Sequence, residues 1–144
     1  MSEEAAETPP SGSGASAGSI VVVDPDPASR GLAEDLEDEL DRQMIALDSM
    51  DFDTESSEEV LEASAYLICW DLGIRSGADL LELVRNDPAL RDRIVLIAME
   101  APTRAAVQMA MALGADGVCC KPYDAEEIAG LLARSEAART ARAA

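Results

Sequence analysis

Short apolar runs without a charged residue recur along the chain, and they constrain its fold more than any other feature. Each run has four to six residues, which is the length of a strand. The runs are Ile20–Val23, Met44–Leu47, Tyr66–Trp70, Ile94–Met99 and Gly117–Cys120. Their apolar character is continuous rather than alternating, which is typical of strands buried on both faces of a parallel sheet.

The segments between these runs carry helix signals. Asp26 before Pro27 is typical of an N-cap followed by proline at the first helical position. The first expected helix presents Leu32, Leu36 and Leu40 on one face, and the second covers Ser56–Ala65, with Val60 and Leu61 inward. The third runs from the Ser76–Asp79 capping box to Asn86. The fourth covers Pro102–Leu113 and is closed by Gly114, and the last is capped by Asp124 and Glu127. The polar segment Asp48–Thr54 is expected to be a turn.

Strands and helices therefore alternate along the whole folded part of the chain. This pattern predicts an α/β fold with a parallel sheet covered by helices on both faces. In such folds the ligand site lies outside the carboxyl ends of the strands. The side chains expected there are Asp24, Asp71, Met99 and Lys121, each at the end of a predicted strand.

Length and composition indicate one domain. The chain has 144 residues, 48% of them apolar, which is enough for one proper core. Residues 1–19 are acidic and rich in serine and glycine, so we expect a disordered tail. The folded domain is expected over residues 20–136. Residues 137–144 are rich in alanine and are expected to be the end of the last helix or a tail.

The charge of the chain narrows the classes of partner. It carries 11 basic and 29 acidic residues, a net charge of −18. Such a surface repels nucleic acid and anionic membranes, so we expect neither as a partner. Proteins with basic patches and divalent cations remain as expected partners. No apolar run can span a bilayer and residues 1–19 lack a secretory pattern, so we expect a cytoplasmic protein with reduced cysteines.

Four motifs in register resemble the receiver domains of response regulators in bacterial two-component signalling. They are Ile20-Val21-Val22-Val23-Asp24, Cys69-Trp70-Asp71-Leu72, Gly114-Ala115-Asp116-Gly117 and Lys121-Pro122-Tyr123, and Asn86-Asp87-Pro88-Ala89-Leu90 is also typical of the family. The resemblance covers about residues 20 to 132. It implies a flavodoxin-like (βα)5 doubly wound fold, a five-stranded parallel sheet with strand order 2-1-3-4-5.

The resemblance also implies a chemistry, the transfer of a phosphoryl group from a kinase histidine to an aspartate. Asp71 stands at the phosphoacceptor position and Lys121 at the position of the lysine that contacts the phosphoryl oxygens. Pro122 stands where the family often has a cis proline. Charge develops on the transferred group, so Mg²⁺ and a lysine are needed to neutralise it. The implied Mg²⁺ ligands, weak or absent here, are Asp24, Asp26, Asp71 and Gly73.

Several positions depart from the family pattern. Pro25 replaces the second acid of the metal-binding pair, and Asp26 is either a substitute ligand or, as we favour, a helix N-cap. Met99 stands at the position of the Ser or Thr and has no hydroxyl for a phosphoryl oxygen. Val118 replaces the switch aromatic. In the loop after Asp71, Arg75 stands at the position of the usual proline, and the glycine is displaced to Gly77.

Two functional interpretations follow, neither of them an enzyme. In the favoured one, the domain is a pseudo-receiver that works as a protein–protein interaction module, with Asp71 and Lys121 forming a structural ion pair. In the other, Asp71 still accepts a phosphoryl group from a histidine kinase. Expected partners are a histidine kinase, a phosphotransfer protein or a signalling enzyme, bound through the face of the fourth helix, fifth strand and fifth helix.

Two further site classes are disfavoured. Binding of a flavin or nucleotide would need a glycine- or hydroxyl-rich phosphate loop after the first strand, and Asp24-Pro25-Asp26-Pro27 is acidic and stiff. A zinc site would need more ligands than Cys69, Cys119 and Cys120, because the chain has no histidine and adjacent strand residues point to opposite faces. Met109 and Met111 are candidates for a partner surface, at least one of them being more typical of core.

Overall fold

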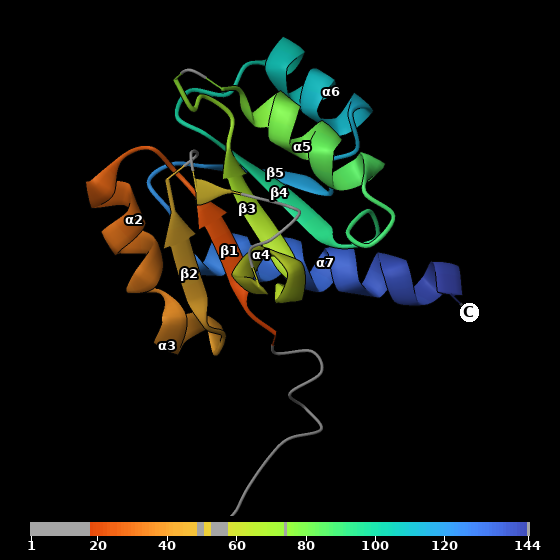
Figure 1. The fold of residues 1–144 in the computed structure, drawn as a ribbon, viewed down its shortest axis with the longest axis horizontal. Helices are drawn as coiled ribbons and strands as arrows, with labels where there is room; N and C mark the ends of the chain where they lie inside the picture. Colours follow the sequence, from red (N-terminus) through yellow and green to blue (C-terminus); the bar gives the residue numbers. More distant parts are fainter. Residues whose placement is uncertain (1–17, 49–50, 53–57, 74, 144) are drawn as a thin grey trace, which may run out of the picture.

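A computed structural model describes residues 18–48, 51–52, 58–73 and 75–143 of the chain. Five parallel strands form one sheet in the order β2-β1-β3-β4-β5 (Figure 1). They are β1 (Ile20–Val23), β2 (Met44–Leu47), β3 (Ala65–Cys69), β4 (Ile94–Met99) and β5 (Gly117–Cys120). The structure thus confirms the predicted flavodoxin-like sheet and its order. Residues 1–17 of the expected tail lie outside the described residues.

Helices cover both faces of the sheet. They are α2 (Pro27–Glu34), α3 (Glu37–Leu40), α4 (Glu58–Glu62), α5 (Gly77–Asn86), α6 (Arg104–Ala112) and α7 (Ala125–Ala143). In Figure 1, α7 runs behind the sheet along its lower part, while α4 lies in front and α5 and α6 stand together at the upper right. The α7 helix includes most of the alanine-rich stretch from residue 137 onward.

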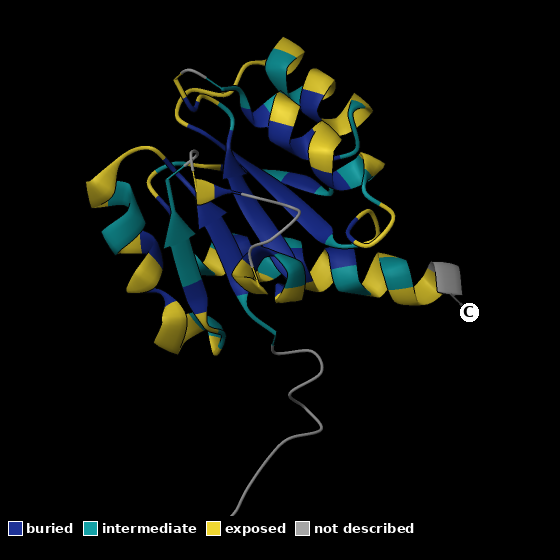
Figure 2. Cartoon of the chain, viewed as in Figure 1, coloured by how far each residue is buried: buried dark blue, intermediate teal, exposed yellow. Residues whose placement is uncertain are grey.

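The core consists of two layers because the strands are buried on both faces (Figure 2). Alternate residues of β1 divide between the layers: Val21 packs with residues of α4, α5 and α6, whereas Val22 packs with residues of α2 and α7. All four β1 side chains are buried, as the uninterrupted apolar run predicted. The first of the two layers also contains Phe52 and Tyr66, whose rings meet edge to face at a centroid distance of 5.7 Å.

Polar side chains cap several helices. The Asp26 carboxylate accepts a hydrogen bond from Ala28 N, and Pro27 occupies the first helical turn, as predicted. The Ser76 hydroxyl accepts from Asp79 N at the start of α5, which confirms that capping residue. Thr103 does the same for α6, so this helix begins at Arg104 rather than at the predicted Pro102. A side-chain acceptor three residues ahead of a free backbone N–H outweighs the helix-start preference of proline.

Two other helix predictions need correction. The leucine stripe is not one helix, because α2 ends at Glu34 and α3 begins at Glu37. Leu36 is buried in the turn between them, while Leu32 is 47% exposed. The predicted helix to Ala65 ends at Glu62, and Ala65 already belongs to β3. Its pairing with Ile20 and Ile94 in the sheet outweighs the helix propensity of alanine.

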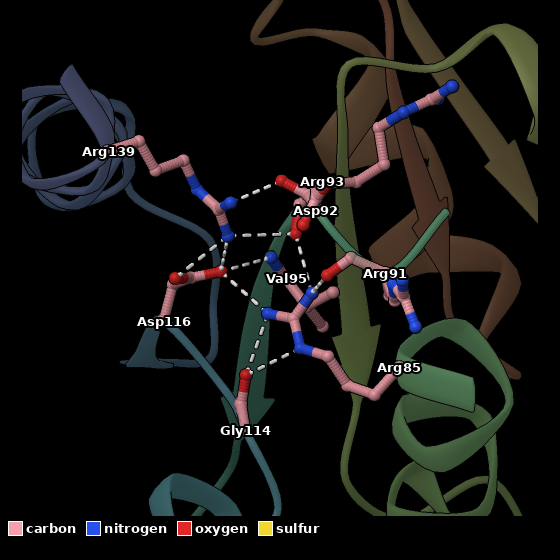
Figure 3. A network of polar contacts seen from close by, with 8 residues as sticks. All are labelled: Arg85, Arg91, Asp92, Arg93, Val95, Gly114, Asp116 and Arg139. Atoms are coloured by element: carbon pink, nitrogen blue, oxygen red, sulfur yellow. Dashed lines mark hydrogen bonds and ion pairs between the residues drawn. The ribbon is translucent and has the colours of Figure 1, made fainter. Parts of the chain in front are cut away.

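An arginine cluster ties the amino end of β4 to three other segments (Figure 3). Asp116, just before β5, accepts hydrogen bonds from Arg85 of α5 and Arg139 of α7, both at 2.9 Å, and from Val95 N at 2.8 Å. The Arg85 guanidinium also donates to the carbonyl of Gly114, and the Arg139 guanidinium to the carbonyl of Arg93. One carboxylate thus holds α5, α7 and the sheet together.

We predict that Asp116→Ala destabilises the fold by about 2–3 kcal/mol, because the two guanidinium groups and the Val95 N–H lose their shared acceptor. The measurement is urea unfolding followed by circular dichroism. Asp92→Ala is the matched control, since Asp92 is exposed and nearby and its loss changes the net charge equally. Equal unfolding midpoints for the two variants would contradict this role of Asp116.

Candidate functional site

A cavity of about 280 Å³ opens at the carboxyl ends of the strands. This is the edge where β1 and β3 lie side by side and the strand order reverses, the usual ligand position in doubly wound sheets. Its lining residues come from the ends of β1, β3, β4 and β5 and from α6: Pro25, Asp26, Cys69, Trp70, Asp71, Ala98, Met99, Glu100, Ala101, Ala106 and Lys121. The structure thus brings most of the predicted site residues together.

Asp24 is fully buried beside this cavity, and both of its carboxylate oxygens have partners. One oxygen accepts from Asp26 N at 2.9 Å. The other accepts from the Tyr123 hydroxyl at 2.6 Å and lies 2.9 Å from the Lys121 ammonium. A buried carboxylate needs such partners to offset the loss of water. Both carboxylate oxygens of Asp24 therefore bind groups of the protein itself.

Lys121 follows β5, and its ammonium group pairs with Asp24. The predicted structural ion pair between Lys121 and Asp71 is therefore wrong. Only 7% of the Lys121 side chain is exposed, and its ammonium also lies 3.8 Å from the Cys69 sulfur. Burial lowers the pKa of Lys121, but the hydrogen bond and negative charge of Asp24 raise that pKa more, so the net pKa lies above its usual value. Lys121 is thus held as a cation.

Asp71 lies at the mouth of the cavity and is exposed. One of its carboxylate oxygens accepts from Gly73 N at 3.2 Å, and Gly73 adopts a φ of 83°, a left-handed conformation that glycine tolerates best. The displaced glycine of the same loop, Gly77, starts α5 close to the strand. A Cβ there would lie 2.5 Å from the Cys69 carbonyl oxygen, so only glycine lets the helix approach β3.

Asp26 caps α2, the role favoured from the sequence. Its carboxylate accepts from Ala28 N at 3.3 Å and from the Ser29 hydroxyl at 2.9 Å. The hydrogen bond from Ser29 is the main cause that keeps the pKa of Asp26 below its ordinary value. Asp26 also lines the cavity, but its oxygens are directed toward the first turn of the helix.

Of the residues that depart from the family pattern, Met99 and Pro25 line the cavity. Met99 ends β4, is 4% exposed and lines the cavity where a hydroxyl is expected in the family. Val118 in β5 is half-buried and packs against the core layer that contains α6. Arg75, in the loop after Asp71, is half-buried as well. The Lys121–Pro122 peptide bond is cis, as the resemblance implied.

A magnesium ion does not fit this arrangement. Mg²⁺ needs several well-aimed oxygen ligands, usually carboxylates together with water. Among the residues that the structure describes, no three Asp, Glu, Cys or His side chains are grouped so that they could hold a metal ion. Both Asp24 oxygens are engaged and Pro25 supplies no carboxylate. Of the three cysteines, Cys69 and Cys119 are buried and Cys120 is exposed.

Tyr123 is the site residue that sequence reasoning missed. It was noted only as part of the Lys-Pro-Tyr motif, yet its hydroxyl donates the short hydrogen bond to Asp24. The available signal was its spacing, two residues after Lys121, together with the need of a buried tyrosine hydroxyl for a partner. Burial is the main cause that raises the pKa of Tyr123, and the negative Asp24 raises it further.

Sequence comparison matches the chain to no protein-family model and to no curated protein. Solved structures do match. A response regulator receiver domain from Clostridium thermocellum is 16% identical with a TM-score of 0.71, and the match covers 85% of this chain and 97% of that one. The chemotaxis response regulator CheY4 of Vibrio cholerae is 15% identical with a TM-score of 0.67, covering 82% and 98%.

A response regulator from Burkholderia pseudomallei, solved with a phosphorylated aspartic acid, a calcium ion and citrate, is 20% identical with a TM-score of 0.63. That match covers 88% of this chain and 73% of the other. The likenesses show that the chain has the fold of receiver domains. In the described part of the chain, no helix combines the length and apolar character needed to cross a membrane.

We predict that neither tyrosine ionises at pH 10 in the folded protein. Burial raises the pKa of Tyr66 to about 12, and the pKa of Tyr123 is raised as well. Because each pKa is higher in the folded than in the unfolded state, this stabilisation is complete below about pH 10 and is lost as the pH rises toward 12.

An absorbance titration at the phenolate band, run alongside circular dichroism, measures this. Both phenolates should appear together with unfolding. Tyr123→Phe should reduce the phenolate signal from two groups to one. A tyrosine that ionises near pH 10 while the dichroism is unchanged would contradict the buried positions of these rings.

Substitutions at Asp26 separate its capping role from any role in the cavity. We expect Asp26→Ala to lower the melting temperature and Asp26→Ser to preserve it, because a serine hydroxyl can accept the same backbone hydrogen bond. Since the pKa of Asp26 is lowered by folding, its stabilisation is present above about pH 3.8 and is lost as the pH falls below that. Equal melting temperatures for both variants at neutral pH would argue against the cap.

Proposed function

We propose that this chain is an atypical receiver domain of two-component signalling that acts mainly as a protein–protein interaction module. The main observation in support is the environment of Asp24, which stands at the position of the family's metal-binding acid. Its carboxylate is buried and already paired with Lys121 and Tyr123. A module that works through its surface needs no metal at this position.

Several groups that would stabilise a transferred phosphoryl group in the family are replaced or otherwise engaged in this chain. Transfer to an aspartate requires positive charge and hydrogen-bond donors at the oxygens of the transferred group. Met99 offers no hydroxyl, and the Lys121 ammonium is engaged with Asp24 rather than with Asp71. A phosphoryl group on Asp71 would therefore meet fewer stabilising contacts, which favours an output independent of phosphorylation.

The proposed docking face is formed by α6, β5 and α7. Met109 and Met111 of α6 are 56% and 47% exposed, so the expectation that one of them belongs to the core is wrong. Methionine suits a partner surface because its flexible thioether adapts to different shapes. A histidine kinase, a phosphotransfer protein or a signalling enzyme with a basic patch would match this face and the net charge of −18, in a cytoplasmic setting without nucleic acid or membrane.

A second function has one observation in its favour. Asp71 is exposed at the cavity mouth, and Lys121 lines the same cavity. In the response regulator from Burkholderia pseudomallei an aspartic acid is phosphorylated. The alternative is therefore a receiver that accepts a phosphoryl group on Asp71, with Lys121 turning from Asp24 to the phosphoryl oxygens.

An amide NMR titration distinguishes the two functions. The protein is titrated with MgCl2 to about 10 mM, above the millimolar range of a working site for a hard cation, and then with beryllofluoride as a phosphoryl mimic. We expect the amides of Asp71, Gly73 and Glu100 to shift no more than they do in Asp71→Asn, which lacks the acceptor carboxylate. Saturable shifts in the wild type that Asp71→Asn abolishes would refute the interaction-only module and favour phosphorylation.

A further inference from the structure

The cavity beside Asp71 is suited to a particular kind of protein segment. We propose that it receives one large apolar side chain, such as leucine, from a partner protein, and that basic residues flank this side chain in the partner. The inference rests on the proposed function because it assumes a protein partner. It adds the chemistry of the segment that binds and the place where it binds.

The interior of the cavity is largely apolar. Ala98 and Met99, at the end of β4, are buried and line it together with the half-buried Trp70 and Ala106. The cavity has a volume of about 280 Å³, and an apolar cavity of about 150 Å³ is already large enough to hold benzene. The space therefore accommodates the side chain of a leucine, a methionine or a phenylalanine.

The mouth of the cavity is acidic. Asp26, Asp71 and Glu100 line it, and all three are exposed. They lie just after β1, β3 and β4, which are neighbours in the sheet, so their negative charges gather at one edge. Basic residues on both sides of an inserted apolar side chain would meet these carboxylates. An apolar centre with a charged rim is the usual arrangement of a protein–protein interface.

Lys121 disfavours the other simple occupants. Among the described residues that line the cavity it alone is basic, and its side chain is only 7% exposed. A cationic group inside the cavity would be repelled by the Lys121 ammonium, and an anionic group would have to pass the carboxylates at the mouth. An apolar group inside with cationic groups outside avoids both repulsions.

The cavity borders the proposed docking face. Ala106 belongs to α6 and Lys121 directly follows β5, and both line the cavity. A partner that lies across α6 and β5 can therefore reach the cavity with one residue. The net charge of −18 attracts any basic segment, so the apolar residue is what selects this position on the surface.

The test compares two capped pentapeptides by amide NMR. Both have two arginines on each side of a central residue, which is leucine in one and alanine in the other, so their charges are identical. Each is titrated into the low millimolar range with the wild type, Glu100→Gln, Glu62→Gln and Ala106→Leu. Glu62 is exposed at the end of α4, shortly before the amino end of β3, so Glu62→Gln removes the same charge far from the cavity mouth. Ala106→Leu fills part of the cavity without changing the charge.

We expect the leucine peptide to shift the amides of Met99 and Ala101 in a saturable way. It should bind the wild type about tenfold more tightly than the alanine peptide, or better, because only leucine buries a large apolar group. Glu100→Gln should weaken binding by about two- to fivefold, as expected for the loss of one exposed ion pair, and Glu62→Gln should weaken it less. Ala106→Leu, if folded by circular dichroism, should bind the two peptides about equally.

Equal affinities of the two peptides for the wild type would overturn the inference, because they would show attraction by the acidic surface alone. Leucine-dependent shifts confined to amides away from the cavity would do the same, as would the absence of any saturable shift. If Ala106→Leu does not fold, the two glutamine variants decide. Equal weakening by Glu100→Gln and Glu62→Gln would then count against binding at the cavity mouth.

This inference and the proposed function can fail separately. The MgCl2 and beryllofluoride titration contains no peptide, and a response that depends on Asp71 refutes the interaction-only module. A leucine peptide that does not bind refutes only this use of the cavity.

Discussion

Segments that are distant in the chain meet at one buried carboxylate, that of Asp24. Asp24 directly follows the interior strand β1, and its partners Lys121 and Tyr123 lie just after the edge strand β5, with Tyr123 99 positions away in the chain. To reach Asp24, these side chains extend past the ends of β3 and β4, which lie between β1 and β5 in the sheet. The ion pair thus links the two strand ends, and Lys121 is the member of the pair that lines the cavity beside Asp71. The position of the Lys121 ammonium in that cavity depends on its pairing with Asp24.

At the opposite end of the sheet, too, a carboxylate links segments that are distant in the chain. There Asp116 is shared by Arg85 and Arg139, so a half-buried carboxylate again joins segments that are distant in the chain (Figure 3). The chain has 11 basic residues, and several of them are used in this internal way. The acidic residues are more numerous and mostly remain on the surface. Internal pairing therefore makes the outer surface more uniformly negative, which suits a basic partner protein.

The accuracy of the sequence predictions varied with the range of the interactions involved. The strand Ile94–Met99 matches its prediction because six continuous apolar residues can be buried only in the interior of the sheet. The start of α5 matches because the bond from Asp79 N to Ser76 is local. The cap of α6 at Thr103 was missed because two local signals, proline and threonine, competed within two residues. Leu32 was placed in one helical stripe with Leu36 and Leu40, yet α2 ends at Glu34, and Leu32 is exposed while Leu36 is buried.

The alternation of strands and helices, and the positions of Asp24, Asp71 and Lys121 at strand ends, follow from local apolar patterns in the sequence. The pairing of the buried charges depends instead on how the strands pack together. The pairing of Lys121 with Asp24 rather than Asp71 depends on the strand order and on the position of Tyr123, which no local pattern encodes. A buried carboxylate takes whichever cation the packed sheet brings within reach, and burial made Asp24, not the exposed Asp71, the group that needs one.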